Sequence, residues 1–368
     1  MQNIIRTLLK QIYFIILPIL QRFVVYKLRH KKEINVIFFA MSISMWRHQH
    51  LYEEMSKHKR FNPIIVIMPS NTYTTDQQST DVEVLKNYFD SKGIPYVLGI
   101  QDNGRVYDVR KNLQPDIIFY PQPYSGYYKE KLSHSKFFDK LICYTPYAFW
   151  TSKGDWSYGL VLHRMAWKLF YSTELHRLDA IEYSPIKDAN VEIVGYPTAD
   201  DFLSNIKTDV WKKQEFKKKR IIWSPHFTIF KGGLLTQSNF LWMSNLMIEL
   251  AQRYSDKIQF AFKPHPGLYT QLCQHSDWGE QKAREYYDLW ETMENSQIET
   301  GEFVDLFMTS DAMIHDCGSF SVEYHYSENP VMYIARNFEE QVEDKNTDTV
   351  IYSFDKILSL LSNCNPNV

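Results

Sequence analysis

Short apolar runs alternate with longer amphipathic stretches along this chain, and this alternation restricts the fold more than any other feature. A continuous apolar run is typical of a strand buried on both faces, and an amphipathic stretch is typical of a helix that covers a sheet. In the first part of the chain, the expected strands are Ile34–Ala40, Pro63–Pro69, Pro95–Ile100, Asp116–Tyr120, Lys140–Tyr144 and Val191–Gly195. The expected helices are His50–His58, Asp81–Lys92 and Tyr158–Tyr171. This order predicts an α/β fold with a parallel sheet.

The alternation begins again after about residue 205. The expected strands of this second part are Ile221–Ser224, Ile258–Lys263, Ala312–His315 and Pro330–Ile334, with helices at Ser238–Tyr254 and Ser319–Tyr326. A chain of 368 residues is long enough for two domains of roughly 150 residues each. We therefore expect two doubly wound, Rossmann-like domains, 33–205 and 206–345, that face a cleft, followed by a C-terminal helix over 346–368. Ligands of such domains lie at the carboxyl ends of the strands.

Glycine is scarce, and this scarcity excludes the usual nucleotide signatures. The chain has 13 glycines and contains neither G-x-G-x-x-G nor G-x-x-x-x-G-K-[ST], so a dinucleotide fingerprint and a Walker P-loop are absent. The net charge of −2 does not indicate the excess of basic residues that is typical of nucleic-acid-binding proteins. The four cysteines form no C-x-x-C, so neither a disulfide framework nor a zinc ribbon is expected, and a reducing compartment is the simplest interpretation.

The N-terminal segment 1–32 is apolar and basic. The uncharged stretch between Lys10 and Arg22 has 11 residues, against the roughly 20 that span a bilayer, and no small-residue cleavage site follows it. Apolar and aromatic side chains mixed with Arg and Lys predict a helix that lies in a membrane interface. The alternative is a first helix that packs on the domain, and Pro18 is expected to kink either form.

A second basic segment, Lys212–Arg220, precedes the first strand of the second domain. Such a run is most often the solvated face of a helix. The alternative is a patch that binds a membrane surface or an acidic polymer. Together with residues 22–32, it gives the near-neutral chain two basic clusters.

Two histidines follow neighbouring strands of the second domain. His226 lies in the Trp223–Phe227 segment, and His265 lies between two prolines in the Phe262–Pro266 segment, after Lys263. Proline fixes the backbone and prevents helical continuation, so His265 is expected to be held rigidly. A histidine at a strand end suits general-base or phosphate-stabilising chemistry, which makes His226, His265 and Lys263 the candidate catalytic residues. The alternative for each histidine is a hydrogen-bonded structural residue.

The segment Ser310–Tyr324 combines a strand with the start of a helix. The strand ends at His315, and Gly318-Ser319 opens the helix. Backbone N–H groups of the first turn form an anion site, with hydroxyls from Ser319 and Ser321. The alternative is an ordinary serine N-cap without a ligand. The candidate residues for a donor nucleotide and its phosphates are Asp316, Gly318, Ser319, Ser321 and Glu323, the last as an acceptor from ribose hydroxyls.

Other motifs point less clearly to chemistry. His48 and His50 follow the first strand after Trp46 and Arg47. A surface role is the favoured interpretation of this pair, and contact with an acceptor is the alternative. An H-x-H pair alone is too little for a metal site, so no metal and no cofactor is expected. The chain has no Asp-x-Asp, which disfavours a metal-dependent GT-A transferase. It also has no G-x-S-x-G, which disfavours an α/β-hydrolase.

These motifs resemble those of the CDP-glycerol glycerophosphotransferase family of teichoic-acid and capsule enzymes. The family's proline turn after a strand is matched by Ser224–His226, its Lys-x-His-Pro by Lys263–Pro266, and its Asp-Tyr-Ser-Ser helix start by Asp316–Ser319, followed by Glu323-Tyr324. Gly195–Pro197 with Asp200 is similar to the family's Gly-Tyr-Pro-Arg-x-Asp. The resemblance covers roughly residues 140–335 and is strongest over 220–335.

The sequence also departs from the family pattern. Thr198 stands where the family usually has arginine, and Cys317-Gly318 replaces Tyr-Ser. The family's first-domain Trp-His-Gly-Thr-Pro, which carries a catalytic histidine, is here Cys143–Pro146. His226 is a candidate for the missing base. Candidate acceptor-side residues are Trp46, Arg47, His48 and Tyr144.

The resemblance implies a GT-B fold and transfer of glycerol phosphate, or a related polyol phosphate, from a CDP-activated donor to a lipid-linked or other cell-surface glycan precursor. It implies a peripheral enzyme on the cytoplasmic face of the bacterial plasma membrane, with no partner nucleic acid. Two alternative enzymes with the same architecture stay open, a GT-B nucleotide-sugar glycosyltransferase and a sugar-nucleotide 2-epimerase. A non-catalytic assembly protein is a further alternative.

Overall fold

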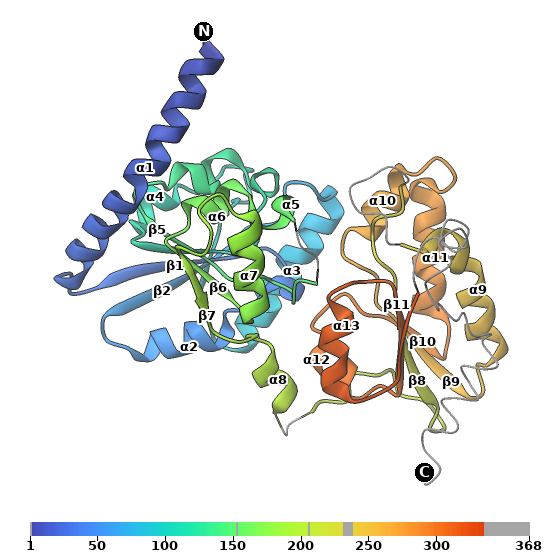
Figure 1. Cartoon of the computed structure of the whole chain (residues 1–368). Helices are drawn as coiled ribbons and strands as arrows, with labels where there is room; N and C mark the ends of the chain where they lie inside the picture. Colours follow the sequence, from blue (N-terminus) through green and yellow to red (C-terminus); the bar gives the residue numbers. More distant parts are fainter. Residues whose placement is uncertain (1, 152–153, 205–206, 231–237, 335–368) are drawn as a thin grey trace. The chain divides into compact units, whose positions relative to one another are not determined.

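The structure of the protein is a computed structural model that describes residues 2–151, 154–204, 207–230 and 238–334 (Figure 1). The chain divides into two compact units, residues 1–200 and 201–368. The sequence analysis placed this division near residue 205. The expected C-terminal helix over 346–368 lies outside the described residues.

A parallel sheet of seven strands forms the centre of the first unit. Its strands are β1 Ile34–Ala40, β2 Phe61–Ile67, β3 Tyr96–Leu98, β4 Ile117–Tyr120, β5 Leu141–Tyr144, β6 Lys168–Tyr171 and β7 Val191–Ile193. Their order across the sheet is β3-β2-β1-β4-β5-β6-β7, and every neighbouring pair is parallel. A parallel sheet needs crossover connections, and the amphipathic stretches His50–His58 and Asp81–Lys92 correctly predicted two of these helices.

Helices cover both faces of this sheet (Figure 1). They are α1 Gln2–Arg29, α2 Gln49–Lys57, α3 Thr75–Ser91, α4 Val109–Leu113, α5 Asp155–Tyr158, α6 Val161–Met165 and α7 Glu174–Tyr183, with the 3₁₀ turn η1 Ile43–Met45. The short helix α8 Ala199–Leu203 spans the boundary between the units, and its Phe202 packs with residues of the second unit. Alternate residues of β1 enter different cores, since Ile37 and Phe39 pack in one cluster and Val36 and Phe38 in another. Burial on both faces explains why β1 is a continuous apolar run.

The second unit is built on a parallel sheet of five strands, in the order β10-β9-β8-β11-β12. The strands are β8 Lys219–Ser224, β9 Ile258–Phe262, β10 Ser296–Ile298, β11 Ala312–His315 and β12 Val331–Tyr333. The helices are α9 Phe240–Arg253, α10 Leu268–Gln274, α11 Gly279–Thr292, α12 Val304–Met308 and α13 Phe320–Glu323, followed by the 3₁₀ turn η5 Tyr324–Ser327.

This second sheet is also buried on both faces. Trp223 of β8 packs in a cluster with residues of α9, α10 and α11, whereas Ile222 packs in a cluster with residues of α12 and η5. Figure 1 shows α12 and α13 on one side of β11 and α9 on the other. The predicted fold class, α/β with two parallel Rossmann-like sheets, is confirmed.

Three expectations about secondary structure are wrong. The helix expected over Tyr158–Tyr171 is the short helix α6 followed by the strand β6, in which buried Leu169 and Tyr171 alternate with half-buried neighbours. The helix expected over Ser319–Tyr326 is the single turn α13, which continues as the 3₁₀ turn η5. The basic run Lys212–Arg220 is not a helix face, because it is irregular as far as Lys218 and then enters β8.

The basic run lies at the amino end of β8, whereas the predicted site follows the carboxyl end of that strand. Two of its cations have carboxylate partners: Lys219 Nζ lies 3.0 Å from Asp311, and Arg220 lies 2.8 Å from Asp209. Residues 212–220 therefore lie at the edge of the sheet opposite to the candidate site.

Candidate functional site

Three segments meet where the five-stranded sheet changes its direction of winding. From β8 the chain moves to β9 and β10 on one side and then to β11 and β12 on the other, so the order reverses between β8 and β11. Ligands of open α/β sheets bind at the carboxyl ends of strands at such a switch point. The segments after β8, β9 and β11 are Pro225–Phe227, Lys263–Pro266 and Asp316–Ser319, the three that the sequence predicts.

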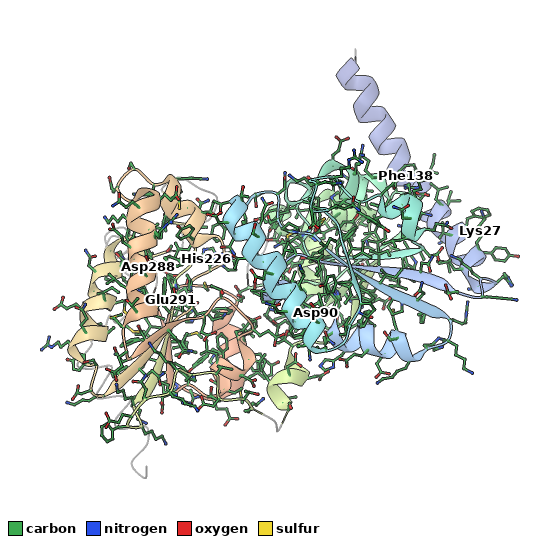
Figure 2. The ribbon with its side chains drawn as sticks, turned by 180° about the vertical axis from the view of Figure 1, so that it is seen from behind. Lys27, Asp90, Phe138, His226, Asp288 and Glu291 are labelled. Carbon is green, nitrogen blue, oxygen red and sulfur yellow. The ribbon has the colours of Figure 1, made fainter. Side chains whose placement is uncertain are left out.

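Hydrogen bonds between the strand ends fix the first two segments to each other. The Ser224 hydroxyl donates to the carbonyl of Lys263 at 2.6 Å, and the amide of His265 donates to the carbonyl of Pro225 at 3.0 Å. Ser224 is completely buried. These bonds hold the two histidine-bearing loops in register, and the His226 and His265 ring centroids lie 4.9 Å apart (His226 is labelled in Figure 2).

The same nitrogen of both imidazole rings accepts a backbone N–H. The amide of Gly267 donates to Nδ1 of His265 at 3.0 Å, and the amide of Thr228 donates to Nδ1 of His226 at 3.4 Å. A neutral imidazole whose Nδ1 accepts a hydrogen bond carries its proton on Nε2. His265 therefore presents an Nε2–H donor. Nδ1 of His226 also lies 2.9 Å from the Thr228 hydroxyl, which can donate or accept, so either nitrogen of that ring can carry the proton.

Both histidines are neutral near pH 7. Burial lowers the pKa of His226 to about 4. Burial also lowers the pKa of His265 well below its ordinary value, and the charge of His226 lowers it further. Two neutral N–H donors side by side suit an anionic ligand, because they can bind oxygen atoms without changing protonation.

Asp316 connects the third segment to the first. Its buried carboxylate accepts the backbone amide of His226 on Oδ1 and the backbone amide of Asn239 on Oδ2. Burial raises the pKa of Asp316 to about 6, against the opposing effect of these two hydrogen bonds. At neutral pH the carboxylate is charged and fixes the loop after β8. Asp316 thus holds His226 in position.

The predicted phosphate turn Gly318–Ser321 leads into a very short helix. The amide of Ser321 donates to the carbonyl of Gly318 at 3.2 Å. The backbone amides of the residues that precede Ser321 therefore lie before the first hydrogen bond of the helix. Ser319 makes no side-chain capping bond. Glu323, at the end of this turn, is 1% exposed. With α13 only four residues long, any anion held here depends on individual N–H and hydroxyl groups rather than on a long helix dipole.

Lys263 is buried at the end of β9, although it carries an ammonium group. Its Nζ donates to the carbonyl of Gly301 at 3.0 Å and lies 5.9 Å from the centroid of the Phe303 ring. The charge of Lys263 also acts on the thiol of Cys317, which follows β11. Lys263 therefore places a positive charge near the carboxyl ends of β9 and β11, close to the position where the strand order reverses.

The predicted acceptor-side residues of the first unit lie in different environments. His48 is buried between the rings of Phe38, Trp46 and Phe119, and burial lowers its pKa to about 3. The Trp46 indole is also buried, and its Nε1 donates to Gln49. These two side chains belong to the core. Arg47 is half-buried and donates to the carbonyl of Trp46 at 3.1 Å.

Tyr144, the remaining predicted acceptor-side residue, lies at the carboxyl end of β5. It is completely buried, and its hydroxyl has no hydrogen-bond partner among the described residues.

The turn after β7 contains Gly195–Pro197, and the conformation of the backbone explains the glycine at its first position. Gly195 has a φ of 85°, which glycine adopts without strain.

The described part of α1 has one packed side and one exposed side. Leu17 and Leu28 are buried, and Gln21 donates to the carbonyl of Met165 at 3.0 Å, so this part of the helix packs on the unit. The exposed apolar side chains of α1 are Ile16, Ile19, Leu20, Phe23 and Tyr26. Figure 1 shows the N-terminal part of α1 extending beyond the sheet, and Figure 2 shows Lys27 on its outer side. None of the helices in the described residues is long and apolar enough to cross a bilayer.

Sequence reasoning missed the residues that orient the site. Asn239, Thr228 and Gly267 act through backbone N–H groups, which no side-chain motif reveals. A steric requirement favours glycine at position 267. A Cβ there would lie 3.3 Å from the Phe227 ring, whose centroid lies 4.3 Å from that of the His265 ring. No group of three or more His, Cys, Asp or Glu side chains in the described residues is arranged to hold a metal ion.

The fold and its switch point define a class, the GT-B-like proteins with two Rossmann-like sheets in one chain. UDP-N-acetylglucosamine 2-epimerase from Rickettsia bellii is similar with a TM-score of 0.51 at 15% identity, covering 90% of this chain and 87% of that one. The UDP-GlcNAc 2-epimerase of Methanocaldococcus jannaschii, in complex with UDP-GlcNAc and UDP, has a TM-score of 0.50 at 15% identity, covering 84% and 86%.

A variant of the wall teichoic acid polymerase TagF is similar with a TM-score of 0.49 at 12% identity, covering 86% of this chain and 73% of that one. No protein-family model matches the sequence, and neither does the sequence of any curated protein. At these identities, the likeness to the epimerases establishes a shared GT-B-like fold.

Proposed function

We propose that the protein transfers glycerol phosphate, or a related polyol phosphate, from a CDP-activated donor to a cell-surface glycan precursor. The observation that carries the proposal is the meeting of the Ser224–His226, Lys263–Pro266 and Asp316–Ser319 segments at one switch point. These are the segments that resemble the CDP-glycerol glycerophosphotransferase family, and they come from three different strands. Their convergence supports a single site for the donor's phosphates.

The reaction joins an acceptor hydroxyl to phosphorus. The hydroxyl oxygen attacks the phosphorus that carries the polyol, a new P–O bond forms, the P–O bond to CMP breaks, and the hydroxyl proton must be removed. Negative charge is spread over the transferring phosphoryl group during this step. The Nε2–H group of His265, the N–H of the neutral His226 ring and the buried charge of Lys263 supply positive potential for it. The amides and hydroxyls of Gly318–Ser321 bind the pyrophosphate, and Glu323 accepts from ribose.

His226 is better suited to donate a hydrogen bond than to act as the base. Its Nδ1 already accepts the Thr228 amide, and a pKa of about 4 makes the ring a weak base at neutral pH. A group with such a low pKa takes up a proton poorly from an attacking hydroxyl. We therefore assign both histidines to the phosphoryl group, which leaves the base to another residue.

The outer side of α1 supports a peripheral location on the cytoplasmic face of the plasma membrane. Exposed Ile19, Phe23 and Tyr26 lie beside Arg22 and Lys27, and this is the combination that inserts shallowly among anionic headgroups. A membrane surface would bring the enzyme to a lipid-linked acceptor.

An alternative is supported by the shared fold, namely a sugar-nucleotide enzyme such as a 2-epimerase or a glycosyltransferase. The relative from Methanocaldococcus jannaschii holds UDP-GlcNAc and UDP, which supports a nucleotide-activated donor of some kind for this chain. The nucleotide that stabilises the protein separates these functions. The proposal requires that CMP or CDP raises the melting temperature more than UDP or GDP.

Direct turnover tests the proposal. The full chain is incubated with CDP-glycerol or CDP-ribitol and a membrane extract from the source organism, and CMP release is measured against heat-inactivated protein. The proposal requires CMP release with at least one donor. UDP-GlcNAc is supplied in parallel, and its conversion to the C2 epimer without nucleotide release would support the epimerase instead.

A further inference from the structure

The basic run Lys212–Arg220 has no part in the proposed transfer. It contains five lysines and one arginine against a single glutamate. All of its residues belong to the second unit, where the run leads into the amino end of β8. A run of this kind is either simply solvated or binds an acidic polymer or a membrane surface. The contacts and exposure of its side chains favour the membrane surface.

Hydrogen bonds hold the first part of the run on the five-stranded sheet. Trp211, directly before the run, is buried. The Gln259 side chain, on β9, donates to the carbonyl of Lys212 at 2.6 Å. The Gln214 side chain donates to the carbonyl of Glu294 at 2.8 Å. The run is irregular, and these contacts nevertheless fix its first residues against the ends of β9 and α11.

The middle of the run exposes an aromatic ring. The side chain of Phe216 is 69% exposed, more than Phe23 and Tyr26 on the outer side of α1. Its neighbours in the sequence, Glu215 and Lys217, are exposed as well. A single exposed apolar side chain is common on protein surfaces and carries no meaning alone. The ring becomes informative because of the charges on both sides of it.

Most cations of the run have no carboxylate to neutralise them. Lys219 and Arg220 form its ion pairs within the part of the chain that the structure describes. The lysines of the run without an ion pair there are Lys212, Lys213, Lys217 and Lys218. Two of these bond to neutral oxygen atoms, Lys212 to the carbonyl of Met293 and Lys218 to the side chain of Gln214. The positive charge of the run is therefore available to an anionic partner.

An acidic polymer and a membrane surface differ in what they offer to Phe216. A soluble polyanion binds lysines through its charged groups and gives an apolar ring no environment better than water. A bilayer with anionic lipids attracts lysines to its headgroups and also accepts an aromatic ring in the apolar zone directly below them. Lysine side chains can follow the ring with their apolar stems while their ammonium groups stay at the headgroups.

We propose that the basic run of the second unit docks on an anionic lipid bilayer. Phe216 inserts between the headgroups, and the lysines on both sides of it bind the lipids' negative charges. This contact is separate from the one proposed for α1, because every residue that makes it belongs to the second unit. It is also independent of the reaction, since the run lies at the opposite edge of the sheet from the candidate donor site.

The test measures binding of the full chain to lipid vesicles by co-sedimentation. The parent protein carries Ile19→Ser and Phe23→Ser, so that any contribution of α1 is reduced. It is expected to bind vesicles of phosphatidylcholine and phosphatidylserine in equal amounts, and to bind pure phosphatidylcholine much more weakly. Binding to the mixed vesicles is expected to fall with added salt, because the contact depends on charge.

Two sets of variants of this parent examine the ring and the charges separately. Phe216→Ser is expected to weaken binding to the mixed vesicles about tenfold. Its control is Trp242→Ser, which removes a 59% exposed ring of α9 that is far from the run in the sequence, and which is expected to bind like the parent. Lys213→Gln with Lys217→Gln is expected to weaken binding about tenfold or more. Lys92→Gln with Lys282→Gln removes the same charge from two exposed positions elsewhere and is expected to have little effect.

Three results would overturn the inference. The first is a parent protein that does not bind the mixed vesicles at low salt. The second is a lysine variant of the run that binds as well as its charge-matched control. The third is loss of binding in that lysine variant while Phe216→Ser binds like Trp242→Ser, which would indicate a site for acidic polymers without insertion into lipid.

Discussion

The Asp316 carboxylate accepts the backbone N–H of His226 and thereby joins the end of β11 to the loop after β8. The bond spans the position where the strand order of the five-stranded sheet reverses. It fixes the loop whose imidazole lies beside His265. The geometry of the proposed donor site therefore depends on a carboxylate that need not touch the donor.

Replacing Asp316 by asparagine is expected to weaken donor binding at least tenfold. An asparagine side chain can accept only one of the two amides on its oxygen, and its NH₂ group faces the other amide as a second donor. The loop after β8 then loses its fixed position. Isothermal titration with CDP measures the effect.

Asp311→Asn is the matched control, because Asp311 precedes β11 at the opposite end of the strand. It accepts the Arg220 amide at 2.8 Å and forms an ion pair with Lys219. Its loss is expected to lower stability and leave CDP affinity within about twofold of wild type. Equal loss of CDP affinity in the two variants would contradict the role given to Asp316.

His265→Ala is expected to lower kcat about 10²–10³-fold, the effect of removing one donor to a charged transition state. His265→Gln is expected to keep more of the activity, because the glutamine amide can place an N–H near the position of Nε2. Steady-state CMP release measures both variants. If glutamine is as damaging as alanine, the imidazole does more than donate a hydrogen bond.

The neutral state of the two histidines also predicts the pH dependence. The pKa of His226 lies at about 4 and that of His265 well below its ordinary value, so neither ring titrates between pH 6 and 9. His226→Gln is therefore expected to lower the rate of CMP release without changing the shape of its pH profile between pH 6 and 9. A changed shape would show that His226 titrates in this range.

Asp81→Asn is expected to stabilise the fold at alkaline pH. The pKa of Asp81 is raised from 3.8 to about 7 in the folded state, so its protonated form stabilises the fold below pH 4. That stability is lost as pH rises through 7, where the ionised carboxylate must stay buried. The gain of the variant grows from pH 4 to pH 8, to at most about 4 kcal/mol.

Urea unfolding at pH 5 and pH 8 measures this gain. Asp76→Asn is expected to stay within about 1 kcal/mol of wild type at both values, because Asp76 is exposed. A constant difference between Asp81→Asn and wild type across this range would contradict the raised pKa.

A double variant of α1, Ile19→Ser and Phe23→Ser, is expected to bind vesicles of phosphatidylcholine and phosphatidylserine about tenfold or more weakly than wild type. The reason is that two exposed apolar side chains are removed. Leu175→Ser with Leu178→Ser, on the exposed side of α7, is the control and is expected to bind like wild type. Vesicle co-sedimentation measures both. Equal binding by both double variants would show that α1 does not dock on lipid.

The central strands could be predicted from the sequence because burial on both faces leaves a clear pattern. The bounds predicted for Ile34–Ala40 and Ala312–His315 agree with β1 and β11. The edge strand Ser296–Ile298 was missed because it is short and polar at Gln297. Lys168–Tyr171 was placed in a helix because four residues are too few to distinguish a period of 2 from one of 3.6.

The donor site was predictable to the extent that its side chains follow strands. His226, His265 and Asp316 are found together because the carboxyl ends of β8, β9 and β11 share one edge. The tautomer of His265 was not predictable, since a backbone amide fixes it. The burial of Asp81 was not predictable either, because a lone aspartate in an amphipathic stretch looks like a surface residue.

The most direct measurement is the release of CMP by the full chain supplied with CDP-glycerol or CDP-ribitol and a membrane extract as acceptor. The account predicts that CMP forms in proportion to polyol phosphate joined to the acceptor, and that His265→Ala largely abolishes both. Absence of CMP above the heat-inactivated control with either donor, together with epimerisation of UDP-GlcNAc by the same preparation, would contradict it.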